Sequence, residues 1–129
     1  MSESLIEAAR SAQLNAHAPY SGYRVGAALE ADDGAVYSGA NVENASYGLS
    51  TCAERVALGA AVATGRRRFR RIAIVTDSTP PAAPCGACRQ ALAEFGLDLE
   101  VLASNGEVER QWSLRELLPD AFGPGDLGR

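Results

Sequence analysis

Apolar residues recur every three to four positions in three segments of the chain, a spacing that predicts amphipathic helices. A shorter fourth helix is expected after Ser113, because Glu116 three residues later completes a capping-box pattern, and Pro119 should end it. Proline and glycine residues mark where the longer helices should begin or end. These helices are expected at residues 4–16, stopped by Pro19; at 52–64, ended by Gly65; and at 84–96, with Pro84 in the first turn.

Five other segments have the alternating or continuous apolar pattern of strands. Turn residues at 32–34 and at Asn105-Gly106 predict two hairpins, and the small polar residues 41–50 predict a loop. The expected strands are residues 23–31, 35–40, 70–76, 98–103 and 107–112. Combined with the helices, they give the order α-β-β-α-β-α-β-β-α, which predicts an α/β fold with a mixed sheet and helices packed on its faces.

Length and composition indicate one globular domain that spans residues 1–129. The chain is 47% hydrophobic and 22% charged, so it can bury an ordinary core. Its net charge of -4 argues against nucleic acid or anionic lipid as a partner. We expect no membrane span, because no apolar run approaches 18 residues, and no export signal, because the first residues are acidic.

The three cysteines change this picture, because an odd and small number does not form a disulfide framework. In the reducing cytoplasm, spaced cysteines more often bind metal or take part in catalysis. Cys52 should begin one helix, and Cys85 and Cys88 should lie in the first turn of another. Helix N-termini favour thiolates, which are the metal-binding form. Three thiolates on one Zn²⁺ would carry net negative charge, which Arg55 and Arg89 could partly neutralise, and water in the fourth position would make the site catalytic in type.

Two other interpretations of the cysteines remain open at this point. The CGAC segment at 85–88 is also typical of thioredoxin-type redox sites. A purely structural zinc site is the second alternative, with His17 as a possible fourth ligand.

Glu54 favours catalysis over both alternatives. It lies two residues after Cys52, where its carboxylate can stand beside a metal-bound water and move protons. A competing interpretation is that Thr51 and Glu54 form a capping box, which would leave the carboxylate tied to its own helix.

The spacing of these residues resembles the signature of zinc-dependent nucleoside deaminases. The match consists of Cys52-Ala53-Glu54 and, about thirty residues on, Pro84-Cys85-x-x-Cys88. Three further blocks resemble the small, single-domain cytidine deaminases: residues 19–29 (PYS and VGAAL), 41–47 (NVENASY) and 117–122 (LLPDAF). Together the blocks cover nearly the whole chain in the right order.

The resemblance implies a three-layer αβα sandwich with a five-stranded mixed sheet and one zinc per chain on Cys52, Cys85 and Cys88. The implied reaction is hydrolytic deamination of cytidine and deoxycytidine to uridine and deoxyuridine plus ammonia, in cytoplasmic pyrimidine salvage. Glu54 would move a proton from the water to ring N3 and then help to protonate the leaving amine, and the Ala53 N–H would donate to the base carbonyl. The family also implies a homotetramer whose active sites are completed by neighbouring subunits.

The resemblance assigns the substrate contacts too. Asn41 and Glu43 would bind the ribose, and a carboxylate there disfavours a phosphate nearby, so a free nucleoside is expected rather than a nucleotide. Tyr23 stands where the family usually has Phe stacked on the pyrimidine, and Tyr adds a hydroxyl that needs a partner if buried. Phe122 would reach a neighbouring subunit's site, and Tyr47 would lie near the subunit contacts or else be a buried aromatic.

Several rival functions remain to be weighed. The chain could be a zinc deaminase for a cytosine-bearing antibiotic or for nucleic acid, a thiol redox protein, or a non-catalytic zinc-binding module. The run Arg66–Arg71 could contact nucleic acid, but it is better explained as a solvated turn at a helix C-terminus, where cations are favoured.

Overall fold

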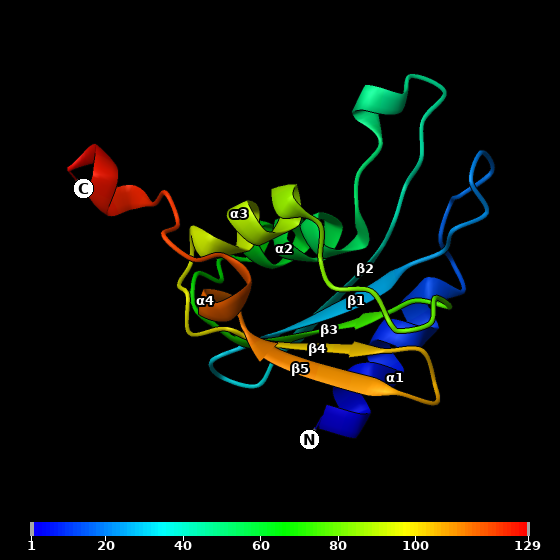
Figure 1. Cartoon of the computed structure of the whole chain (residues 1–129), viewed down its shortest axis with the longest axis horizontal. Coiled ribbons are helices and arrows are strands. Elements are labelled where there is room, and N and C mark those ends of the chain that lie inside the picture. The colour runs from blue at the N-terminus through cyan, green and yellow to red at the C-terminus, as the bar shows by residue number, and fades with distance from the viewer. Residues whose placement is uncertain (1, 129) are drawn as a thin grey trace.

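The computed structural model describes residues 2–128, and its elements follow the order expected from the sequence (Figure 1). Two short 3-10 helices, η1 and η2, are added to that order. The elements are α1 (Ser2–Gln13), β1 (Gly26–Ala31), β2 (Val36–Ala40), η1 (Tyr47–Leu49), α2 (Ala53–Ala63), β3 (Phe69–Val75), α3 (Gly86–Ala93), β4 (Glu100–Ser104), β5 (Glu109–Ser113), α4 (Leu114–Leu117) and η2 (Pro124–Leu127).

The strands form one five-stranded mixed sheet in the order β2-β1-β3-β4-β5. β3 and β4 run parallel, and the other three neighbouring pairs run antiparallel. A parallel pair requires a crossover connection, and α3 supplies it between β3 and β4. The carboxyl end of central strand β3 therefore opens directly into the segment that leads to α3.

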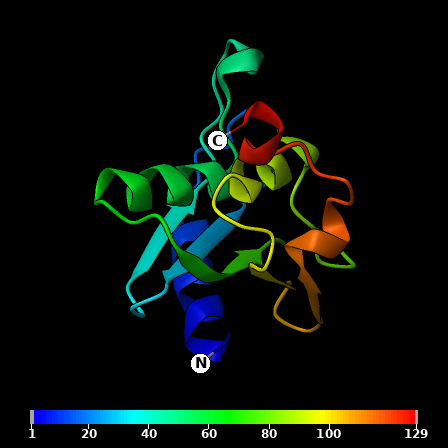
Figure 2. The same ribbon diagram turned by 90° about the vertical axis from the view of Figure 1, so that its left-hand side faces the viewer.

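Helices cover both faces of the sheet, which confirms the αβα sandwich (Figures 1 and 2). Alternate residues of β1 point into two separate cores, as the pleat of a strand requires. Ala28 packs with Leu5 and Ile6 of α1, whereas Leu29 packs on the other face with residues of α2 and α3. The central strand β3 is buried on both faces from Ile72 to Val75, as its apolar run predicted.

Two glycines let helices approach strands too closely for any side chain. A Cβ atom on Gly26 would lie 1.9 Å from the Ala9 carbonyl oxygen of α1. A Cβ atom on Gly39 would lie 2.5 Å from the Ala57 nitrogen and 2.7 Å from the Ala53 oxygen of α2. Because Gly39 has no side chain, the first turn of α2 can pack directly against β2.

Several boundaries differ from the expected ones by one to three residues; the strand expected at 23–31, for example, begins at Gly26. Three further differences can be related to local contacts. The first helix ends at Gln13 rather than at 16, where the Gln13 side chain donates to the Arg24 carbonyl, and Leu14 is 67% exposed. Pro84 lies before the helix rather than in its first turn, because Cys85 is extended and serves as N-cap.

The third difference is the β4–β5 connection, which spans residues 105–108 instead of two residues. The Asn105 side chain accepts hydrogen bonds from the backbone of Glu107 and Val108, which stabilises this wider loop. The capping box of Ser113 and Glu116 is present as expected. Within residues 2–128, no helix is both long and apolar enough to cross a membrane.

Candidate functional site

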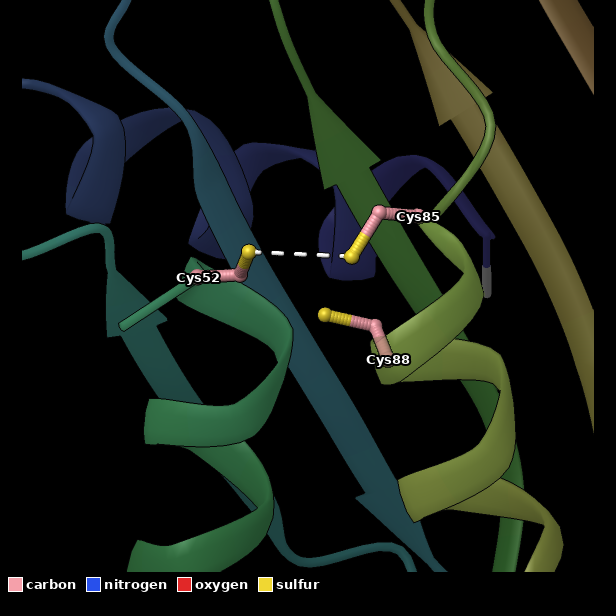
Figure 3. A group of neighbouring side chains, drawn as sticks. All are labelled: Cys52, Cys85 and Cys88. Carbon is pink, nitrogen blue, oxygen red and sulfur yellow. Dashed lines mark hydrogen bonds between the residues drawn. The ribbon is translucent and has the colours of Figure 1, made fainter. Parts of the chain in front are cut away.

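Three thiols from two helix N-termini converge at one end of the sheet (Figure 3). Cys52 is the N-cap of α2, Cys85 is the N-cap of α3, and Cys88 lies in the first turn of α3. Both N-cap residues have extended backbones, which turn their side chains away from their own helices and toward each other. All three sulfurs lie within 4.8 Å of one another.

The sulfur geometry fits a tetrahedral zinc ion. Zn–S bonds of about 2.3 Å at tetrahedral angles place two sulfurs about 3.8 Å apart, and the Sγ atoms of Cys52 and Cys85 are 3.8 Å apart. All three cysteines are free thiols. Within residues 2–128 the cluster contains these thiols only, and neither His17 nor Glu54 belongs to it. Three sulfur ligands and an open fourth position are typical of a catalytic rather than a structural zinc site.

Arg55 supplies positive charge to this cluster from the next turn of α2. Its Nη2 lies 3.7 Å from the Cys52 sulfur. Hydrogen bonds from Cys88 and Arg55 lower the pKa of the Cys52 thiol, and the pKa of Cys88 is raised by its bond to Cys52 and by burial. The Arg55 Nε is buried without a hydrogen-bond partner among the described residues.

Arg89 does not share this role, contrary to the sequence-based expectation. Its guanidinium donates to the backbone carbonyls of Pro84 (2.7 Å) and Leu117 (2.9 Å) instead. The side chain therefore ties α3 to the end of α4 rather than neutralising the thiolates.

Glu54 is buried beside the thiols, with 5% of its surface exposed. The alternative capping box is not formed, since Cys52 is the N-cap and the Thr51 hydroxyl donates to the Leu49 carbonyl. Burial raises the pKa of the Glu54 carboxyl to about 7, and the negative charge of Cys52 adds to this effect. A carboxyl with a pKa near neutrality can both accept and return a proton, as a general acid–base group must.

A cavity of about 210 Å³ opens over Glu54 and the thiols. Its position at the carboxyl end of β3 is where open α/β sheets usually bind ligands. Most of its wall is apolar. The residues that line it are Tyr23, Val25, Asn41, Cys52, Ala53, Glu54, Ile74, Thr76, Ala82, Ala83 and Cys85.

Among the predicted substrate contacts, Tyr23, Asn41 and Ala53 line this cavity. The Asn41 side chain also fixes the neighbouring backbone: its Nδ2 donates to the Tyr23 carbonyl (2.8 Å), and its Oδ1 accepts from Val25 N–H (2.9 Å). An amide keeps one further donor hydrogen and one further lone pair after these bonds. Ala53 is the first residue of α2, where helix N–H groups lack an acceptor within the helix.

The other predicted contacts lie outside the cavity. Glu43 lines a neighbouring depression with Tyr47, and its carboxylate accepts hydrogen bonds from the backbone of Tyr20 (3.0 Å) and Ser21 (3.1 Å) and from the Ser21 hydroxyl. The Ser21 hydroxyl bond, with the two backbone bonds, lowers the Glu43 pKa. Tyr47 is 74% exposed, so it is not a buried aromatic, and Phe122 is 58% exposed on the C-terminal segment.

Sequence reasoning did not identify Thr76, Ala82 and Ala83 as cavity residues. Thr76 directly follows the buried strand β3, and this position at the carboxyl end of a strand was the available signal. The two alanines belong to an irregular segment whose path no periodic pattern reveals.

The Arg66–Arg71 run is mostly occupied by protein contacts. Arg66 bonds to Asp33 (2.6 Å) and the Tyr37 hydroxyl (3.0 Å), and Arg71 pairs with Glu30 (2.8 Å). Arg67 donates to the Val62 carbonyl at the end of α2. Arg66 and Arg67 thus fit the interpretation as a turn after a helix C-terminus, whereas Arg70 and Arg71 lie in β3.

Comparison with known proteins adds independent information. Residues 1–104 match the family described as "Cytidine and deoxycytidylate deaminase zinc-binding region". A cytidine deaminase of Halalkalibacterium halodurans is 48% identical over 126 residues, which cover 95% of this chain and 95% of that protein. A cytidine deaminase of Mycobacterium tuberculosis is 46% identical over 121 residues, which cover 94% of this chain and 89% of that protein.

Solved structures show the same likeness. The crystal structure of cytidine deaminase from Burkholderia pseudomallei superposes with a TM-score of 0.92 at 52% identity. The match covers 95% of this chain and 99% of that chain.

Proposed function

This chain belongs to the zinc-dependent cytidine deaminase family of hydrolases, and from this membership we propose that it converts cytidine and deoxycytidine to uridine and deoxyuridine with release of ammonia. The observation that best supports this reaction is the placement of a buried carboxyl, Glu54, beside three thiols in a tetrahedral zinc geometry with one open position. Both face the same cavity. A structural zinc site would need neither the cavity nor the buried acid.

Cys52, Cys85 and Cys88 would hold zinc, which would act as a Lewis acid and lower the pKa of a water molecule beside Glu54 to about 7. Glu54 accepts one proton from this water and delivers it to ring N3 of the cytosine, while the water oxygen forms a bond to C4. The regenerated carboxylate then takes the second proton from the new C4 hydroxyl and donates it to the amine, which leaves C4 as ammonia; a pKa raised by burial to about 7 suits these transfers. The free N–H of Ala53 donates to the carbonyl oxygen of the base.

The apolar walls and the ring of Tyr23 hold the flat face of the pyrimidine in this proposal. Asn41 uses its remaining donor and acceptor for a ribose hydroxyl. Glu43 reaches the ribose from the neighbouring depression, and its negative charge disfavours a 5′ or 3′ phosphate. The expected substrates are therefore free nucleosides, consistent with a cytoplasmic salvage enzyme that consists of a single domain over residues 1–129.

We infer that the active enzyme is a homotetramer. Residues 41–51 project from the sheet as an arm that carries η1 (Figures 1 and 2). Tyr47 and Leu49 on this arm are 74% and 70% exposed, and Phe122 on the C-terminal segment is 58% exposed. Large exposed apolar groups on projecting segments favour contact with another subunit. In the tetramer, Phe122 of one subunit completes a neighbour's cavity.

A direct test is to follow ultraviolet absorbance of the zinc-loaded protein with cytidine, deoxycytidine, cytidine 5′-monophosphate and free cytosine. The proposal predicts turnover of the two nucleosides and at least a hundredfold lower kcat/KM for the nucleotide and the free base. Free cytosine lacks the ribose that Asn41 and Glu43 bind, and the phosphate of the nucleotide is repelled by the Glu43 carboxylate. Equal rates on cytosine and cytidine would contradict the ribose role of Asn41 and Glu43. A preference for the nucleotide would contradict the nucleoside assignment.

A further inference from the structure

Two segments far apart in the sequence lie side by side, and both contribute residues to the cavity wall. Residues 23–25 precede β1 and residues 76–83 follow β3, next to the paired residues Gly26 and Val75 of these neighbouring strands. Neither segment itself belongs to a helix or strand. Beyond the Gly26–Val75 pair, side-chain hydrogen bonds link the two wall segments.

A chain of three hydroxyl groups spans the two walls. The Tyr23 hydroxyl bonds to the Ser78 hydroxyl (3.3 Å), which in turn bonds to the Thr76 hydroxyl (2.8 Å). Thr76 is 2% exposed and also accepts from the Ala82 N–H (3.3 Å), so the inner end of the chain is fixed. The Ser78 carbonyl accepts from the Asn105 side chain (3.1 Å), which holds Ser78 from the opposite side.

The Gln13 side chain ties the same two segments at a second point. It is 6% exposed, and its Nε2 donates to the Arg24 carbonyl (3.1 Å) and to the Asp77 carboxylate (3.3 Å). Arg24 follows Tyr23, and Asp77 precedes Ser78. The Tyr23–Ser78 and Gln13–Asp77 hydrogen bonds therefore connect the two wall segments through neighbouring residues.

We propose that the Tyr23 hydroxyl is a positioning group: its bond to Ser78 fixes the Tyr23 ring at the cavity mouth and thereby raises the affinity for the pyrimidine base. This inference rests on the proposed nucleoside deamination and deepens it. Phenylalanine at this position would present the same ring face without the bond. The hydroxyl contacts Ser78 of the neighbouring wall segment rather than the reacting atoms, so it acts on binding and not on the chemical step.

The test is a double-mutant cycle on the zinc-loaded protein with cytidine. Tyr23→Phe and Ser78→Ala should each raise KM about 2- to 10-fold, the range of one net hydrogen bond, while kcat changes less than twofold, because the bond contributes equally to ground and transition states. The double variant should raise KM no more than the larger single effect, because both changes remove the same tie. Ser78→Thr, which keeps a hydroxyl, should restore the native KM.

Tyr37→Phe is the matched control, because it removes a tyrosine hydroxyl that bonds to Arg66 and does not line the cavity. It should leave KM unchanged. Multiplicative effects of Tyr23→Phe and Ser78→Ala, or a native KM in Tyr23→Phe, would overturn the proposal.

A second measurement does not depend on turnover. Amide hydrogen exchange of residues 77–83 in the zinc-loaded protein should be faster in Tyr23→Phe than in the native chain, because the second wall loses its tie. Unchanged exchange would refute the tie itself. A native protein that is inactive on cytidine would refute the proposed function, whereas the exchange result would still decide whether the tie exists.

Discussion

At the scale of single residues, the site depends on how charge is balanced around the three thiols. The Cys52 and Cys88 thiols are hydrogen-bonded to each other, and Arg55 is the cation that contacts Cys52. The sequence allowed the thiols and Glu54 to be placed together, because their types and spacing carry the chemistry. It did not distinguish Arg55 from Arg89, since both lie one to three residues from a cysteine and only side-chain direction separates them.

Replacing Arg55 by Gln should weaken zinc binding about 10- to 100-fold, the usual cost of losing an outer-shell partner of a metal site. The guanidinium of Arg55 partly balances the negative charge of the thiolates, so its removal makes the charged form of the site less stable. Competition with a chromophoric chelator measures the affinity. Arg115→Gln, which removes an exposed guanidinium paired with Asp98, is the control and should retain native affinity. Equal losses in both variants would show that the effect is not local.

Zinc affinity should fall as the pH is lowered from 8 to 6. The pKa of Cys88 is raised, so its thiol carries a proton in the metal-free protein, and this proton must leave when zinc binds. The sign follows from mass action: more protons favour the metal-free form, by about tenfold per pH unit for each thiol proton displaced. Chelator competition at several pH values checks this. An affinity that is flat over this range would show that all three thiols are already ionised.

At the scale of elements, the three thiols and Glu54 are positioned by where two helices begin. The N-caps of α2 and α3 carry Cys52 and Cys85, and α2 reaches its position because Gly39 of β2 has no side chain. The hydrophobic pattern, together with capping signals, predicted the four α-helices and five strands of residues 2–128 in order, but not η1 or η2. It predicted the boundaries less well, because ends depend on tertiary hydrogen bonds such as that of Gln13 to Arg24, which no local pattern encodes.

Gly39→Ala should destabilise the protein by about 2–4 kcal/mol and also lower zinc content, because the new methyl group collides with backbone atoms of α2 near Cys52. Chemical denaturation and metal analysis measure the two effects. Gly59→Ala, in the middle of α2, is the matched control. Gly59 is exposed, and a Cβ atom there would meet no other atom within 4 Å, so alanine should stabilise the helix by about 0.5–1 kcal/mol. A neutral Gly39→Ala variant would contradict the close approach of β2 and α2.

At the scale of the whole molecule, one chain holds the catalytic groups but leaves some predicted substrate contacts apart from them. The αβα sandwich, the cavity and Glu54 come from one subunit, whereas Phe122 and Tyr47 are exposed on projecting segments. The resemblance placed these two aromatics at subunit contacts, which the hydrophobic pattern alone could not do, because an exposed apolar residue and a core residue look alike in sequence.

Leu49→Asp should dissociate the proposed tetramer and reduce activity, because it puts a charge on the exposed apolar tip of the arm. Light scattering coupled to size exclusion measures the assembly. Val108→Asp, which adds the same charge in the β4–β5 loop, should leave the assembly intact. A native chain that is monomeric and fully active on cytidine would contradict the shared sites.

The central claim is that a buried carboxyl beside a three-thiol zinc site moves the protons of deamination. The most direct measurement is the rate of cytidine deamination by Glu54→Gln with zinc content determined on the same sample. We predict one zinc per chain, a native fold and a kcat lower by about 10²–10⁴-fold, because glutamine keeps the shape of the side chain but cannot accept the proton. A zinc-loaded variant that deaminates cytidine at a near-native rate would contradict the account.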